Sequence, residues 1–205
     1  LVWTIMQAKI SKNISKVYLS SDSNKILAIG KKYGAITIKR PKNISGDKAK
    51  SEEAVLHLLT KLDYNPDGIV MLEPTAPLRN LTDIDSCVND FYHYKWDSGF
   101  TGAILDDFLI WKFNKKEKLE PINYNFKKKV PRQLREPEIV ENGCIFIFTP
   151  ESIKKYNNRF GGKIGFSANQ VWQSFEIDNI EDWKFVSLIF KTYLLKKYQK
   201  IKLKN

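Results

Sequence analysis

The chain has few cysteines and histidines, the residues that form disulfides and zinc sites in small proteins. Its 205 residues include two cysteines and two histidines, and Cys87 and Cys144 lie far apart with no Cys-x-x-Cys pair. The sequence therefore predicts neither a disulfide framework nor a zinc site. It also lacks an apolar run near the roughly 18 residues of a membrane span, and its N-terminus lacks the pattern of a signal peptide. These absences favour a globular protein of the reducing cytoplasm.

Arginine is scarce as well. The chain carries a formal net charge of +11, yet only five of its 34 basic residues are arginines. Arginine makes the bidentate contacts to phosphates and base edges, and no zinc-finger, RNP or basic-zipper pattern is present. We therefore expect no nucleic-acid partner. A nucleic-acid binder stays as an alternative that the charge alone suggests, and a salt-sensitive gel shift would support it.

The most informative stretch runs from Gly68 to Arg79. Four apolar residues, 69–72, form a short run of the kind that fills a strand covered on both faces. Pro74 and Pro77 then restrict the backbone, so Glu73 and Thr75 lie on a stiff loop. Thr82, followed three residues later by Asp85, resembles a capping box at the start of the next helix. Ligands of open α/β sheets bind at such strand ends. The alternative is a structural turn with a solvated arginine.

Short strands alternate with helices through the first half of the chain. We expect strands at 17–20, 35–39 and 69–72, and helices at 24–32, 51–62 and 82 to about 94. This alternation indicates βαβ units in a parallel sheet. The chain opens inside an apolar, helix-like stretch at 1–10, so we expect a segment to precede it.

The middle of the chain lacks this alternation. Candidate strands at 98–104 and 108–113 are followed by a lysine-rich section, 115–129, that reads as exposed loop. We interpret about 105–142 as an insertion into a single α/β domain of residues 1–205. We expect it to pack antiparallel strands against another subunit.

The last third contains a candidate metal site. After an apolar strand at 144–148, the stretch 174–178 reads as a strand whose alternation places Glu176 and Asp178 on one face. Two such carboxylates can share Mg²⁺, which binds one or two carboxylates together with substrate phosphates. The alternative is that Asp178 caps the helix from 180 to about 198 while Glu176 is merely solvated.

Six segments, in order, resemble one family. They are 20–23 (Ser-Ser-Asp-Ser), 33–35 with Arg40-Pro41, 72–79 (Leu-Glu-Pro-Thr-Ala-Pro-Leu-Arg), 131–133 (Pro-Arg-Gln), 141–143 (Glu-Asn-Gly) and 174–183. The chain is similar to the cytidylyltransferases that activate sialic acid and related nonulosonic acids, also called CMP-sialic acid synthetases. The resemblance implies a three-layer α/β/α fold with a mostly parallel Rossmann-like sheet of the nucleotide-diphospho-sugar transferase type, and a homodimer.

The resemblance also implies a reaction and a set of site residues. CTP and a nine-carbon 2-keto sugar acid would give a CMP-sugar and diphosphate, with Mg²⁺ as the cofactor. The catalytic residues would be Glu176 and Asp178, as metal ligands, and Arg132, as donor to the sugar carboxylate or a nearby phosphate. The substrate-binding residues would be Arg40 and Ser51 for the cytidine, Glu73, Thr75 and Arg79 on the loop facing sugar and nucleotide, and Gln133. Asn142 and Phe146 would shape the sugar side of the pocket.

The sequence departs from the family pattern at three points. Glu73 replaces a glutamine near the sugar and Ala76 replaces a serine, so the choice among sialic, legionaminic and pseudaminic acid stays open. The family's glycine-rich basic loop, which holds the CTP triphosphate, has no counterpart here, so we expect these 205 residues to bind CTP poorly or to be inactive. The remaining alternatives are a cytidylyltransferase for an eight-carbon keto sugar acid and a noncatalytic nucleotide-sugar-binding protein.

Overall fold

The computed structural model describes residues 1–105 and 108–199. Its central sheet contains β3 (Ile69–Met71), β7 (Glu138–Phe148), β4 (Ser98–Leu105) and β8 (Ile164–Asn169), in the order β3-β7-β4-β8. β4 and β8 are parallel, whereas β7 is antiparallel to both β3 and β4. Three of the four strands therefore point the same way, and their carboxyl ends share one edge. This is the mostly parallel α/β sheet that the alternation of elements predicted.

A second, two-stranded sheet lies beside β3. β1 (Tyr18–Ser21) and β2 (Ile36–Lys39) are parallel and are joined by α2 (Asn24–Lys32), whose first turn is capped by Ser23. Between β1 and β3 lies a mostly apolar cavity of about 230 Å³. In the part of the chain that the structure describes, β1 pairs only with β2 and β3 only with β7.

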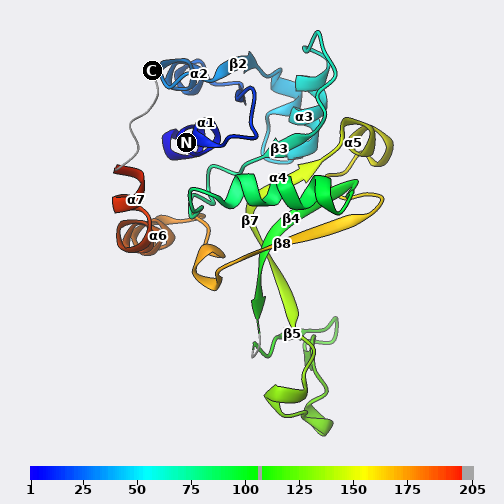
Figure 1. The fold of residues 1–205 in the computed structure, drawn as a ribbon. Helices are drawn as coiled ribbons and strands as arrows, with labels where there is room; N and C mark the ends of the chain where they lie inside the picture. Colours follow the sequence, from blue (N-terminus) through cyan, green and yellow to red (C-terminus); the bar gives the residue numbers. More distant parts are fainter. Residues whose placement is uncertain (106–107, 200–205) are drawn as a thin grey trace.

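Helices cover both faces of the central sheet (Figure 1). The alternation along β7 sends Ile145 and Ile147 toward α4 (Asp83–His93), where they join one core cluster. Phe146 and Phe148 point the opposite way and pack with residues of α3 (Ser51–Leu59) and α5 (Pro150–Tyr156). The three-layer α/β/α architecture predicted from the sequence is confirmed.

A third core cluster closes the carboxyl edge of the sheet. α6 (Ile180–Tyr193) and the short α7 (Leu195–Gln199) contribute residues that pack on Leu78 and on Trp3 of α1 (Val2–Ile10). The expected single helix from 180 to about 198 is therefore two helices, separated at Leu194. The described residues also form four 3₁₀ turns: η1 (Lys42–Ile44), η2 (Phe126–Lys128), η3 (Arg132–Leu134) and η4 (Val171–Gln173).

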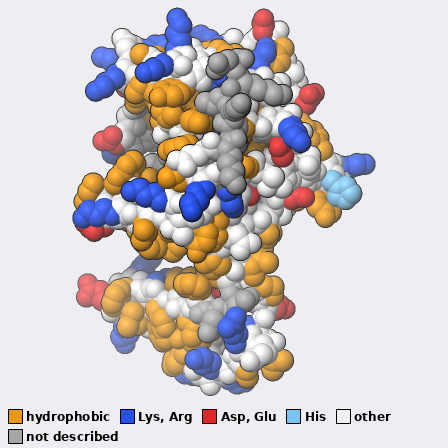
Figure 2. All heavy atoms as spheres, turned by 60° about the vertical axis from the view of Figure 1, so that its left-hand side comes forward, with side chains coloured by type: hydrophobic (Ala, Val, Ile, Leu, Met, Phe, Trp, Pro, Cys, Tyr) orange, Lys and Arg blue, Asp and Glu red, His pale blue; other side chains and the backbone are white. Residues whose placement is uncertain are grey.

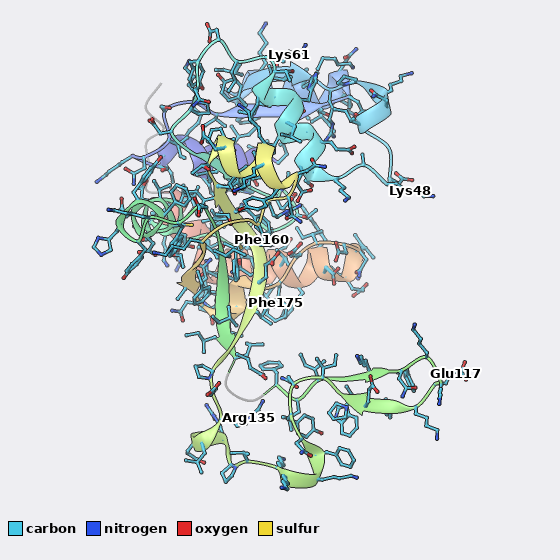
Figure 3. The ribbon with its side chains drawn as sticks, turned by 90° about the vertical axis from the view of Figure 1, so that its right-hand side faces the viewer. Lys48, Lys61, Glu117, Arg135, Phe160 and Phe175 are labelled. Carbon is cyan, nitrogen blue, oxygen red and sulfur yellow. The ribbon has the colours of Figure 1, made fainter. Side chains whose placement is uncertain are left out.

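The middle region forms an arm that projects from the body. β4 and β7 extend past the rest of the sheet and lead into a hairpin of β5 (Trp111–Phe113) and β6 (Leu119–Pro121), followed by η2 and by η3 (Arg132–Leu134) (Figure 1). Figure 3 shows Arg135 at the base of the arm and Glu117 at its far tip. The arm occupies the expected insertion, about 105–142, of which residues 106 and 107 lie outside the described residues.

Two local predictions were wrong. Residues 174–178 form no strand, and run as extended chain between η4 and α6. Thr82 precedes α4 but its side chain makes no capping hydrogen bond, because Asp83 instead accepts from the backbone N–H of Asn80 at 2.6 Å, and Asp85 accepts from the hydroxyl of Ser11 at 2.5 Å. Among the described helices, none is long and apolar enough to span a bilayer.

Candidate functional site

The loop after β3 is held in place by a buried arginine. The guanidinium of Arg79 donates from Nε to the carbonyl of Cys144 at 2.6 Å, from Nη1 to Oε1 of Gln7 at 2.9 Å, and from Nη2 to the carbonyl of Glu73 at 2.7 Å. Its side chain is 0% exposed. We had expected Arg79 to contact substrate, and the structure corrects this: Arg79 fixes the loop from inside, because its side chain is fully buried and all three of its guanidinium nitrogens donate to groups of the protein.

The segment 174–178 lies beside this loop at the carboxyl edge of the sheet. The backbone N–H of Ile177 donates to the carbonyl of Thr75 at 2.9 Å, which brings Glu176 and Asp178 next to the exposed turn of the loop. Asp178 does not cap α6. That role belongs to Asn179, whose side chain accepts from the backbone N–H groups of Glu181 at 2.9 Å and Asp182 at 3.0 Å. The capping interpretation of Asp178 is therefore wrong.

Glu176 lies among other carboxylates. It is half-buried against Gly143, whose φ of +62° and close approach leave no room for a side chain: a Cβ there would lie 2.1 Å from Oε1 of Glu176. Burial raises the pKa of Glu176, and the negative charges of Asp178, Glu73 and Glu141 raise it further, against a smaller lowering by Arg79. The carboxylates that shift this pKa come from three separate segments of the chain. Carboxylates gathered in this way offer oxygen ligands to a cation.

Asn142 and Phe146 occupy buried positions on β7. Asn142 is 1% exposed, and its Oδ1 accepts from Oγ1 of Thr101 at 2.9 Å and from the N–H of Cys144 at 3.1 Å. A backbone N–H can only donate, so this bond fixes Oδ1 and leaves Nδ2 as a buried donor without a partner among the described residues. Phe146 is 2% exposed and packs in the core under Arg159, so its predicted place in the wall of the sugar pocket is corrected to a supporting one.

Sequence reasoning missed Arg159, which lies in the loop between α5 and β8. Its Nε is 2.7 Å from Oε1 of Glu52 on α3, its Nη1 is 3.6 Å from Oε1 of Glu73, and its guanidinium lies 4.4 Å from the centroid of the Phe146 ring. Burial raises the pKa of Glu52, but hydrogen bonds and charge from Arg159 outweigh it and bring the pKa below its usual range. No local pattern marks Arg159, because its partners come from distant parts of the chain.

The remaining predicted residues lie around or away from this group. Ser51 begins α3 directly before Glu52, the residue that pairs with Arg159. Arg40 follows β2, where its N–H donates to the carbonyl of Ser21 at 2.9 Å and its buried Nε has no partner among the described residues.

Arg132 and Gln133 are on the arm, in η3. Arg132 lines an arm cavity of about 680 Å³. Figure 3 places neighbouring Arg135 well apart from Phe160 and from Phe175, which directly precedes Glu176 in the sequence. The structure thus brings Glu73, Thr75, Glu176 and Asp178 together. Asn142 lies buried on β7 directly before Gly143, and the predicted catalytic Arg132 lies outside that group on the arm.

Curated proteins with similar sequences carry names that match the resemblance. The chain is 24% identical over 201 residues to post-translational flagellin modification protein B of Campylobacter coli, covering 93% of this chain and 83% of that protein. It is 37% identical over 89 residues to N-acylneuraminate cytidylyltransferase of Escherichia coli, covering 43% of this chain and 21% of that one, and 24% identical over 184 residues to the Oncorhynchus mykiss protein of the same name, covering 88% and 42%. The chain thus spans less than half of these two cytidylyltransferases. No protein-family model matches the chain.

Solved structures give the same fold. CMP:2-keto-3-deoxy-manno-octonic acid synthetase in complex with CTP aligns with a TM-score of 0.66 and 10% identity, covering 94% of this chain and 87% of that one. The 2-C-methyl-D-erythritol 4-phosphate cytidylyltransferase of Thermus thermophilus aligns with a TM-score of 0.57 and 10% identity, covering 92% and 87%. The fold is therefore that of the nucleotide-sugar cytidylyltransferases. The resemblance to N-acylneuraminate cytidylyltransferases noted in the sequence is confirmed by the curated relatives.

Proposed function

We propose that the chain is a cytidylyltransferase that joins CMP from CTP to a nine-carbon 2-keto sugar acid of the nonulosonic type, with release of diphosphate. The observation that carries this proposal is the hydrogen bond from Ile177 to Thr75, because it unites the proline-rich loop with the Glu176–Asp178 segment at the carboxyl edge of the sheet. Both segments resemble those of the acylneuraminate cytidylyltransferases. The names of the curated relatives support the same reading.

Mg²⁺ fits the residues at this site. Glu176 and Asp178 are close enough for one charge to raise the pKa of the other, and both supply the oxygen ligands that Mg²⁺ prefers. Among residues 1–105 and 108–199 there is no group of three or more His, Cys, Asp or Glu placed to hold a metal alone. Mg²⁺ does not need one, since it usually keeps several waters and takes substrate phosphates as further ligands. When bound, it would neutralise phosphate charge and lower the pKa of a coordinated hydroxyl.

The protein groups around the site would position the reactants. Arg79 holds the loop backbone rigid, so that Glu73 and the exposed Thr75 keep a fixed spacing from Glu176. The buried Nδ2 of Asn142 is a donor without a partner among the described residues, and it is suited to an oxygen of the substrate. Preorganised groups of this kind save the entropy that free side chains would lose on binding.

The arm would supply the rest of the sugar pocket from a second copy. Arg132 and Gln133 lie on the arm and away from the carboxylates of their own copy, and the arm displays large apolar side chains to solvent. Figure 2 shows such side chains over much of the lower part of the molecule. A homodimer that packs these arms would cover the apolar surface. It would also allow Arg132 of one copy to reach the site of the other.

The test is Mg²⁺-dependent release of pyrophosphate from CTP with a panel of nine-carbon and eight-carbon 2-keto sugar acids. It is run on the 205-residue chain and on any longer product that its gene encodes. Release with a nine-carbon acid, abolished by EDTA and reduced about a hundredfold or more in Asp178→Asn, is the expected result. Release with the eight-carbon acid alone would show that the substrate is an eight-carbon and not a nine-carbon sugar acid. No release with any sugar would overturn the proposal.

A further inference from the structure

Arg159 lies between two carboxylates that come from different elements. Its Nε donates to Oε1 of Glu52, on α3, at 2.7 Å, and its Nη1 lies 3.6 Å from Oε1 of Glu73, on the loop after β3. The first contact is a charge-assisted hydrogen bond, and the second is an ion pair beyond hydrogen-bond distance. Arg159 therefore bridges α3 and the loop through two ion pairs.

The centre of this bridge has one orientation. The guanidinium of Arg159 lies 4.4 Å from the centroid of the Phe146 ring, which is buried on β7. The side chains of Arg159 and Glu52 are 19% and 12% exposed, so solvent screens their pairing only in part. A planar guanidinium that is stacked on a ring and bonded at one edge cannot rotate freely. The strand β7 thus sets the direction from one carboxylate to the other.

The loop end of the bridge is attached to the candidate site. The carbonyl of Glu73 accepts from Nη2 of Arg79 at 2.7 Å, so one arginine holds the backbone of this residue and another holds its side chain. Two residues further on, the carbonyl of Thr75 accepts from the N–H of Ile177 at 2.9 Å. A series of contacts therefore runs from α3, through the bridge and the loop, to the carboxylate segment 174–178.

Apolar contacts also join α3 to the sheet. Two leucines of α3 pack in one core cluster with Ile69 and Met71 of β3. This packing holds the helix on the sheet, but it is non-directional and does not set the spacing between the first turn of α3 and the loop. Ser51 and Glu52 lie in that first turn. The bridge through Arg159 supplies a directional contact at this end of the helix.

Resting on the proposed function, we propose that Arg159 is a positioning residue, which holds the nucleotide side of the site, at the start of α3, at a fixed spacing from the loop and the carboxylate segment. Arg159 acts through Glu52 and Glu73 and does not itself bind substrate. Breaking the bridge leaves the groups that bind each substrate in place but misaligns the two bound substrates. An in-line transfer tolerates little misplacement, so the loss falls on kcat and not on KM.

The first experiment measures pyrophosphate release by Arg159→Met and Glu52→Met, on the same proteins as the test of the proposed function. Methionine at either position nearly preserves side-chain size and removes the ion pair, and Glu52→Met decides the question even if Arg159→Met does not fold. Glu181→Met is the matched control, because Glu181 pairs with Lys184 at an exposed place on α6. Both bridge variants should lower kcat per folded molecule about tenfold or more, with KM for CTP and for the sugar changed less than about threefold. The control should match the wild type.

The second experiment needs no turnover. Hydrogen exchange is measured on peptides that cover the loop at 73–79 in the wild type, in Glu52→Met and in the Glu181→Met control. Exchange in the loop should be about tenfold faster in Glu52→Met, because the bridge no longer restrains Glu73, and unchanged in the control. A purely local effect of the substitution on α3 would leave the loop as it is in the wild type.

The outcomes separate the two proposals. If the wild type turns over a sugar acid but the bridge variants keep their kcat per folded molecule, or change KM alone, the positioning proposal is overturned and the cytidylyltransferase proposal stands. Unchanged exchange at 73–79 in Glu52→Met overturns the positioning proposal whatever the activity. If the wild type releases no pyrophosphate with any sugar acid, the cytidylyltransferase proposal is overturned, and the positioning role is overturned with it.

Discussion

Arg79 stabilises the loop after β3, although its place in the proline-rich loop motif suggested that it binds substrate. It stands in a conspicuous motif at the end of a strand, yet its guanidinium lies under the loop and ties Glu73, Cys144 and Gln7 together. Only the packing of α1 and β7 over the loop decides which way this side chain points. The motif located the site correctly, and the burial of its arginine could not be read from neighbouring residues.

Replacing Arg79 by methionine should therefore lower stability before it lowers substrate affinity. The change leaves two buried carbonyls and an amide oxygen without donors, and we expect a loss of about 3–5 kcal/mol in the free energy of unfolding. Urea denaturation followed by circular dichroism measures it. Lys184→Met is the control, because this lysine makes only an exposed pair on α6 and should change the value by less than about 0.5 kcal/mol. A stable Arg79→Met protein would return Arg79 to the role of substrate ligand.

Glu52 makes stability depend on pH in a predictable direction. Because its pKa is lowered in the folded state, the ionised group stabilises the fold above the usual carboxyl value of about 4.3, and this contribution is lost as pH falls through the folded pKa. The stability difference between wild type and Glu52→Gln should thus be largest at neutral pH and shrink below about pH 4.3. Urea midpoints measured from pH 7 to pH 3 test this. A difference that grows toward acid would contradict the assignment.

At the scale of elements, local patterns predicted what local forces determine. Ser23 caps α2 and Asp83 begins α4 close to the expected positions, because capping and helical periodicity depend on near neighbours. The first half of β7 was missed because Glu141-Asn142-Gly143 reads as a turn. In the structure it is an irregularity within a strand, where the pairing of β4 with β7 shifts register between Phe100 and Gly102.

The prediction of a strand at 174–178 was wrong for a related reason. The alternating residues of this stretch resemble a strand, but a strand also needs a neighbour with a free edge. Here Ile177 makes a single backbone hydrogen bond to the loop at Thr75, and Ser174 bonds back to Val171 within the preceding turn. The carboxylates that the alternation would have aligned are brought together instead by the loop, by Gly143 and by the start of α6. The sequence thus indicated the correct residues for the site, although the secondary structure predicted for 174–178 was wrong.

The start of α6 allows a clean separation of capping from catalysis. Asn179→Ala removes the acceptor for two N–H groups and should lower the free energy of unfolding by about 1 kcal/mol. Asp178→Ala should leave stability within about 0.5 kcal/mol, because its carboxylate makes no hydrogen bond among the described residues. Thermal unfolding of the two variants, measured side by side, checks this. The opposite order would restore Asp178 as the cap.

At the scale of the whole molecule, the arm displays several large apolar side chains to solvent. Phe113, Leu119 and Leu134 are 71%, 60% and 74% exposed, on an arm that continues from β4 and β7 (Figure 1). Surfaces of this kind usually mark protein contacts. The sequence indicated an arm by the loss of helix alternation, but its protrusion and the separation of Arg132 from the carboxylates are properties of the folded chain.

We expect Phe113→Asp combined with Leu134→Asp to abolish self-association through the arm. Charges placed in a packed apolar interface cost several kcal/mol, which is enough to dissociate a typical dimer. Sedimentation equilibrium should show a dimer for the wild type and a monomer for the variant. Leu188→Asp is the control, since Leu188 is 63% exposed on α6 and away from the arm. A monomeric wild type, or a variant that stays dimeric, would exclude the arm as the interface.

The cavity between β1 and β3 has a mechanical consequence. Elsewhere the body is held by strand pairing and by core clusters that pack side chains from several elements, but across this line the two sheets are joined by side chains and covering helices alone. A boundary between two sheets that has no main-chain hydrogen bonds across it opens at a lower free-energy cost than paired strands do. We therefore expect the two-stranded unit of β1, α2 and β2, which carries Arg40, to open before the central sheet does. In the proposed site, Arg40 at the cytidine end would move with this unit. The loop after β3 at the sugar end would not, because Arg79 holds its backbone.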